Sequence, residues 1–270
     1  MPRTGFAPSA GAQIYYETAG GGPPLMLIHA GVANSRMWSE QLKSFSETHK
    51  VVVFDQRGFG KTPWVPEPYA DRSDVLAVMD HLDIESAVLV GCSIGGSIAL
   101  HVSLDAPDRV DGLVLIGAVA RGWEPERGWP SSPKLEAAEA ANEAGHIEEV
   151  LDLEAEIWLA GEGRALEDLD RSLVDLFIDM DRIPLSTEKE RGEFVEPFEP
   201  PVNERLAEIT MPCLTVVGAH DLPDMIESAE YLANRISDRS HVVIESAAHL
   251  PSLEQPEAFN KALRVFLDTM

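Results

Sequence analysis

Short apolar runs alternate along the chain with longer segments whose apolar positions recur at helical spacing. An amphipathic strand, Ala12–Gly20, is expected to begin the fold. The later runs are continuously apolar and have the length of buried strands; they span 24–30, 50–55, 86–92, 110–119, 212–221 and 241–249. Helical segments span 35–48, 73–82, 94–104 and 224–235, and a last one starts near Pro256. Val-, Ile- and Leu-rich strands separated by helices predict an α/β fold with a mostly parallel sheet covered by helices on both faces.

The alternation stops after Val119. Residues 121–200 hold prolines, tryptophans, helical stretches and an excess of acidic side chains, but no convincing strand. The strand–helix pattern resumes at Pro212. We therefore predict a core of residues 1–120 and 201–270, with residues 121–200 forming a helical cap inserted over one end of the sheet. The alternative is that these helices are ordinary parts of the wall around the sheet.

Composition narrows the class of protein. The chain has 270 residues, 44% of them hydrophobic, and a net charge of −25, with 46 acidic against 21 basic side chains. A negative field of this size repels phosphate backbones, so we expect no nucleic-acid partner. The N-terminus lacks the apolar segment of a signal peptide, and no 18-residue apolar run occurs, so we expect no membrane partner either. The two cysteines, Cys92 and Cys213, lie in apolar runs, which favours reduced thiols and a cytoplasmic location.

Three chemically useful side chains follow three of the predicted strands. Ser93 follows the run that ends at Cys92, Asp221 closes the run from Pro212, and His249 closes the run from His241. The carboxyl ends of parallel strands share one edge of the sheet, where ligands bind, so we expect these side chains to meet there. Glycines surround the serine in "GCSIGG", as a tight strand-to-helix turn requires. His249 would act as general base on Ser93, with Asp221 orienting its imidazole.

The order Ser93, Asp221, His249 along the chain is that of the α/β-hydrolases. The sequence resembles that superfamily over nearly its whole length outside residues 121–200. "LIHAGVANSRMW" resembles the family's oxyanion loop, "FDQRGFGKT" its Asp-x-Arg-Gly-x-Gly turn, and "AAHLPSLEQPEAF" its histidine segment. The resemblance implies an oxyanion hole made by the backbone N–H groups of Gly31 and Ile94. Ala30 stands where many relatives have glycine, and Val32 is the alternative donor.

Several nearby residues have structural explanations. His29 is expected to order its loop rather than act as a base. Asp224 competes with Asp221, but the family's Gly-x-x-Asp pattern matches Gly218 to Asp221. Asp55 and Arg57 are expected to brace a turn as a pair, Cys92 to pack, and His220 to help shape its turn. Trp38 is expected to lie in the core. The aromatic residues left open between packing and pocket lining are Trp123, Trp129, Trp158 and Phe177.

The expected reaction is hydrolysis of a small carboxylic ester or lactone through an acyl-serine, without a cofactor or a metal. Ser93, at the strand-to-helix turn, argues against haloalkane dehalogenases and epoxide hydrolases, which resemble this fold but carry aspartate at that position. Ile94 argues against proline iminopeptidases, in which tryptophan usually follows the serine. Three alternatives stay open: a carbon–carbon bond (vinylogous diketone) hydrolase, a cofactor-free haloperoxidase or perhydrolase, and a ligand receptor that retains the triad. The chain is expected to be a monomer or a homodimer.

Overall fold

The computed structural model describes residues 2–126, 128–129, 132–187, 191–195 and 199–270. These residues form one eight-stranded sheet in the order β1-β2-β4-β3-β5-β6-β7-β8. Strands β3 to β8 are parallel, and β1 and β2 are antiparallel to their neighbours at one edge. The strands are β1 Arg3–Ser9, β2 Ala12–Ala19, β3 Pro24–Ile28, β4 Lys50–Phe54, β5 Ala87–Cys92, β6 Val110–Ile116, β7 Cys213–Gly218 and β8 Arg239–Ile244. The predicted mostly parallel sheet is therefore confirmed.

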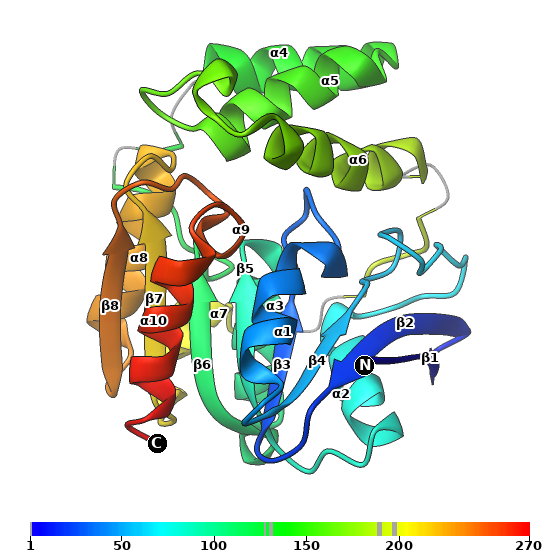
Figure 1. Cartoon of the computed structure of the whole chain (residues 1–270), viewed down its shortest axis with the longest axis vertical. Coiled ribbons are helices and arrows are strands. Elements are labelled where there is room, and N and C mark those ends of the chain that lie inside the picture. Colours follow the sequence, from blue (N-terminus) through cyan, green and yellow to red (C-terminus); the bar gives the residue numbers. More distant parts are fainter. Residues whose placement is uncertain (1, 127, 130–131, 188–190, 196–198) are drawn as a thin grey trace.

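Two separate apolar clusters cover the two faces of the sheet. Leu25 and Leu27 of β3 point into one cluster with helices α1 (Ser39–Phe45) and α10 (Pro256–Leu267). Met26 and Ile28 point into the other, with the helices α2 Asp71–His81, α3 Ile94–Asp105 and α8 Pro223–Arg235. Successive residues of a strand face opposite sides, and each buried aliphatic side chain contributes about 1.5–3 kcal/mol. This is why the runs are continuously apolar. Figure 1 shows the sheet between these helical layers.

The structure departs from the predicted elements at their ends. A strand, β1, precedes the one expected to begin the fold; it contains Gly5 and Pro8, which are poor strand formers, and it lies at the sheet edge, where proline is tolerated. The predicted helix 35–48 divides into a 3-10 turn, Ser35–Trp38, and α1. The strands predicted to reach Val119 and His249 end at Ile116 and Ile244. The chain beyond these points is free to form the loops of the sheet edge.

The segment predicted to be a cap is helical. It contains α4 (Pro133–Ala144), α5 (Ile147–Glu154), a π-helix (Ala155–Ala160), the 3-10 turn Leu166–Asp168 and α6 (Arg171–Thr187). Figure 1 shows α4, α5 and α6 stacked above the sheet domain. Within the described part of this segment, strand pairing is limited to an isolated bridge between Phe194 and Tyr69. We call residues 121–200 the cap, keeping the predicted boundaries.

Short helices complete the chain: Pro107–Arg109 before β6, α7 (Val202–Arg205) and Leu206–Glu208 before β7, and α9 (Pro251–Glu254) before α10. None of the helices that the described residues form has the length and apolar character needed to cross a lipid bilayer.

Candidate active site

Ser93 lies on a strained turn between β5 and α3. Its φ of 54° and ψ of −119° lie in a region that non-glycine residues rarely adopt. The turn is fixed by a 2.7 Å hydrogen bond from the Ser93 N–H to the Ile116 carbonyl. A Cβ on Gly91 would lie 2.2 Å from the Gly95 carbonyl oxygen, and one on Gly95 would lie 2.3 Å from the Ile28 carbonyl oxygen. The flanking glycines are therefore required by close backbone approach, as the sequence predicted.

Asp221 and His249 form a buried pair at the ends of β7 and β8. The imidazole Nδ1 lies 2.9 Å from Oδ2 of Asp221 and 3.1 Å from Oδ1. Oδ1 also accepts a 2.8 Å hydrogen bond from the Leu222 N–H. Both side chains are 2% exposed or less, so this geometry is shielded from water. Because Nδ1 faces the carboxylate, Nε2 is the ring nitrogen left to exchange a proton.

The turn after β6 brings the serine and histidine sides of the site together. The Ile116 carbonyl accepts the Ser93 N–H, and the next residue, Gly117, packs on the imidazole: a Cβ there would lie 3.0 Å from Cε1 of His249. Cys92, beside the serine, directs its Sγ toward the His249 carbonyl oxygen at 3.6 Å. The Ser93 hydroxyl does not cap α3 and has no hydrogen-bond partner among the described residues. The structure thus brings the three residues to one edge of the sheet, without a formed bond between Ser93 and His249; such bonds are often long in ligand-free enzymes.

The charge balance around His249 favours its protonated form. Burial alone lowers the pKa of the imidazole, but the charge and hydrogen bond of Asp221 oppose this, helped by the charges of Glu254 and Asp224. The net result is a pKa of His249 raised above its ordinary value. An imidazolium formed during a reaction is therefore stabilised in place.

The two predicted oxyanion donors face the same cavity. Gly31 and Ile94 both line a cavity of about 250 Å³, and a Cβ on Gly31 would lie 3.6 Å from Cγ2 of Ile94. Ile94 is the first residue of α3, where helix N–H groups have no partner within the helix. The Gly31 N–H has no hydrogen-bond partner in the described chain. Val32, the alternative donor, lines the cavity as well.

His29 holds the loop after β3, which contains the predicted oxyanion donor Gly31. Its Nε2 accepts the Gln56 N–H at 2.9 Å, and its Nδ1 lies 2.8 Å from the Ala30 carbonyl oxygen, which also accepts the Ala33 N–H at 3.1 Å. Burial lowers the pKa of His29, consistent with a neutral ring in this role. Ala30 is fully buried and does not adopt a positive φ, so alanine fits at this position without backbone strain, although many relatives have glycine there.

Asp55 and Arg57 brace turns, but not as the predicted pair. Asp55 accepts the N–H groups of Ser35 and Lys61, both at 2.8 Å. Arg57 instead forms a buried ion pair with Asp74 of α2, at 2.7 Å. Spacing along the chain suggested the nearest carboxylate, whereas the partner comes from a helix seventeen residues away.

The positions of the other candidate residues distinguish between their predicted roles. Asp224 is buried near His249 but forms no hydrogen bond with it, whereas Asp221 does. His220 lies with Nδ1 2.7 Å from the Glu162 carbonyl oxygen. Trp38 and Phe177 are buried in the core and Trp123 packs against Tyr231 and Trp129, whereas Trp158 lies over His249, with ring centroids 4.7 Å apart.

Sequence reasoning missed polar residues that the fold brings to the site. Glu254 lies in "AAHLPSLEQPEAF", where the sequence predicts no role for it, and Arg164 of the cap contacts it at 2.6 Å. Asp71 lines the cavity, where burial raises its pKa to about 6. Arg191 also lines the cavity and donates to the Tyr69 hydroxyl at 2.9 Å. Nothing in the spacing of these residues signalled a shared location.

Comparisons with known proteins agree with this fold. Residues 23–147 match the family model described as alpha/beta hydrolase fold. The chain is 28% identical over 251 residues to a protein named putative carbamate hydrolase RutD from Pseudomonas syringae pv. syringae, covering 91% of this chain and 94% of that one. It superposes on Est816, described as an N-acyl homoserine lactone degrading enzyme, with a TM-score of 0.77, 28% identity and 97% and 99% of the two chains. It also superposes on an esterase from Exiguobacterium antarcticum with a TM-score of 0.79, 26% identity and 98% and 100% coverage.

Proposed function

Because this chain belongs to the α/β-hydrolase superfamily, we propose that it is a serine hydrolase that cleaves a small carboxylic ester or lactone. One observation carries the proposal. Asp221 and His249 form a buried pair at the same edge of the sheet as Ser93, which lies on a strained turn, and the next residue, Ile94, lines a cavity together with Gly31. Together these groups supply a nucleophile, a base and an oxyanion hole.

The reaction follows from the roles of these groups. His249 Nε2 takes the hydroxyl proton while the Ser93 oxygen forms a bond to the substrate carbonyl carbon. The N–H groups of Gly31 and Ile94 stabilise the resulting oxyanion, a contribution worth on the order of 100- to 1000-fold in rate per donor. The intermediate collapses as the carbon–oxygen bond to the leaving group breaks, and that oxygen takes the proton from His249. Water, deprotonated by His249, then releases the acid and regenerates Ser93.

The cavity supports a small substrate. Its volume is about 250 Å³, and its walls come from both the oxyanion loop and the cap, including Asn142, Glu154 and Leu185. The relatives named for esters, lactones and carbamates all point to attack on a carbonyl with a heteroatom leaving group. Cys92 and Cys213 are free, buried thiols, which supports the cytoplasmic location we propose.

A parallel substrate screen tests this proposal. We expect repeated turnover of short-chain p-nitrophenyl esters or small lactones by the wild type, and slower or no cleavage of vinylogous diketones. Turnover of the diketones at the higher kcat/KM would instead assign the site to carbon–carbon bond hydrolysis. Bromination or peroxyacid formation faster than hydrolysis would assign it to the perhydrolase class. A single slow turnover on every ester would favour a receptor.

A further inference from the structure

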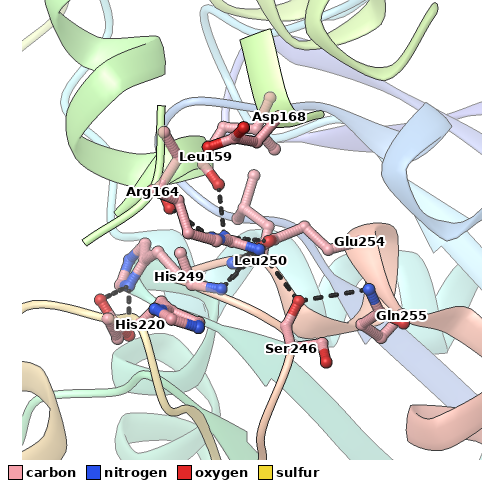
Figure 2. Close-up of polar contacts among 12 residues, drawn as sticks. Leu159, Arg164, Asp168, His220, Ser246, His249, Leu250, Glu254 and Gln255 are labelled. Carbon is pink, nitrogen blue, oxygen red and sulfur yellow. Dashed lines mark hydrogen bonds and ion pairs between the residues drawn. The ribbon is translucent and has the colours of Figure 1, made fainter. Parts of the chain in front are cut away.

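The loop that carries His249 is held by one buried carboxylate. Glu254 accepts the Ala248 N–H with both oxygens at 3.0 Å and the Leu250 N–H with Oε1 at 3.1 Å. These are the amides on either side of His249. The Glu254 side chain is only 2% exposed, so its carboxylate is held in place by these bonds rather than by water. Figure 2 shows Glu254 directed at this loop. The position of the imidazole therefore depends on Glu254.

The counter-ion of Glu254 comes from the cap. Arg164 contacts Oε2 of Glu254 at 2.6 Å with a side chain 14% exposed. The same guanidinium donates to the carbonyls of Leu159 at 2.8 Å and Ala160 at 2.7 Å, and to that of Ser246 at 2.9 Å (Figure 2). Leu159 and Ala160 end the π-helix, whose last carbonyls have no partner inside the helix. Arg164 thus joins the end of the π-helix to the loop of the histidine.

The same π-helix also contacts His249 directly. The His249 N–H donates to the Trp158 carbonyl at 3.2 Å, and the Trp158 ring lies over the imidazole at 4.7 Å between centroids and an angle of 44°. Short π-helical segments are rare and occur often at functional sites. A shift of this segment relative to the sheet would move Trp158 and Arg164 together, and both touch the histidine loop.

We propose that Arg164 and Glu254 are positioning residues that couple the seating of the cap to the orientation of His249. The inference rests on the proposed role of His249 as the base. With the pair formed, the π-helix, the amides of Ala248 and Leu250 and the imidazole form one hydrogen-bonded unit. When the cap lifts, Arg164 leaves, and Glu254 keeps a buried charge without its partner, which is costly. The site is therefore competent only with the cap seated.

The test compares three substitutions with a matched control. Glu254→Gln keeps the shape but removes the charge, Arg164→Met removes the link, and Arg164→Lys keeps a cation without the planar fork. Asp179→Ala is the control, because Asp179 of the cap contacts Arg36 of the core at 2.6 Å through an ion pair that is exposed. The folded fraction of each variant is measured by thermal unfolding.

We expect Glu254→Gln and Arg164→Met to lower kcat about 10- to 100-fold with little change in KM, as displacement of a catalytic group does. Arg164→Lys restores part of the loss, Asp179→Ala stays near wild type, and the double variant Arg164→Met/Glu254→Gln is no worse than the poorer single one. The pH profile supplies a second readout. Activity of the wild type falls as pH drops through the raised pKa of His249, because only the neutral ring is a base. Glu254→Gln removes a negative charge that raises this pKa, so the acid limb of its profile moves to lower pH. Arg164→Met keeps the carboxyl group but removes the cation that lowers the pKa of Glu254, so its shift to lower pH is no larger than that of Glu254→Gln.

Two results would overturn the coupling. One is a kcat of folded Arg164→Met equal to that of wild type. The other is a loss in Asp179→Ala as large as in Arg164→Met, which would make cap attachment in general the cause. If Arg164→Met does not fold, kcat of folded Arg164→Lys and Glu254→Gln is compared with wild type instead, and values equal to wild type would overturn the coupling. The coupling can be tested even if the proposed function is wrong and the wild type shows no Ser93-dependent turnover. The imidazole NMR signals of His249 then report the coupling. Signals that are the same in Arg164→Lys and Glu254→Gln as in wild type would contradict it.

Discussion

Replacing Ser93 by alanine is expected to lower kcat for ester or lactone hydrolysis by at least about 10⁴-fold, because no other nucleophile can form the acyl intermediate. The remaining rate over uncatalysed hydrolysis would come from the amides of Gly31 and Ile94 and from substrate binding. The fold should persist: the hydroxyl has no hydrogen-bond partner among the described residues, and the backbone strain at φ 54° is the same for alanine. Initial rates and thermal unfolding of the purified variant measure both effects.

Ser103→Ala is the matched control for Ser93→Ala. Ser103 lies on the same helix, α3, is buried, and donates to the Leu100 carbonyl at 2.8 Å, away from the edge of the sheet where the cavity lies. We expect this variant to keep kcat within about twofold and to lose on the order of 1 kcal/mol of stability with its hydrogen bond. Near-normal turnover in folded Ser93→Ala would remove Ser93 from the mechanism.

Asp221→Asn is expected to lower kcat about 10⁴-fold while leaving KM almost unchanged. The carboxylate accepts from His249 Nδ1 at 2.9 Å, and an amide NH₂ group in its place would favour the tautomer with the proton on Nε2. That tautomer cannot accept the serine proton. The variant also loses the negative charge that stabilises the imidazolium formed in the reaction. Steady-state kinetics above the acid limb of the pH profile measure the loss.

Asp224→Asn separates the two candidate carboxylates. Asp224 is buried near His249 and raises its pKa by charge alone, without a hydrogen bond to it. We expect a loss of less than about tenfold, with the acid limb moved to lower pH by removal of that charge. A larger loss in Asp224→Asn than in Asp221→Asn would mean that Asp224 orients His249 in the working enzyme.

The pattern along the chain predicted the parallel sheet and the edge that Ser93, Asp221 and His249 follow, but not the residues at which the strands end. Apolar runs of strand length must be buried, and parallel strands must present their carboxyl ends at one edge, which located Ser93, Asp221 and His249. Glycines at 91 and 95 were predictable for a similar reason, since a Cβ at either position would clash with backbone within the turn or the adjacent strand. The pattern did not predict strand β1 because it contains Gly5 and Pro8, which are poor strand formers.

Contacts between distant surfaces left no signal in the sequence. Arg164 is 90 residues from Glu254, and the pair exists only because the cap folds back over the histidine loop. The packing of Trp158 on His249 likewise depends on a π-helix that no spacing rule predicts. Arg57 has Asp55 two residues away, yet pairs with Asp74, since α2 presents that carboxylate to the buried guanidinium. In each case the fold, and not proximity along the chain, selects the partner.

The most direct measurement is the mass of the protein after reaction with a p-nitrophenyl alkylphosphonate, which transfers its phosphonyl group to an activated serine and releases p-nitrophenolate. We predict one phosphonyl group per chain, located by peptide mapping on Ser93 and absent in Ser93→Ala. Unlabelled Ser93 in a protein that still hydrolyses esters, or a label on another residue that abolishes turnover, would contradict the account.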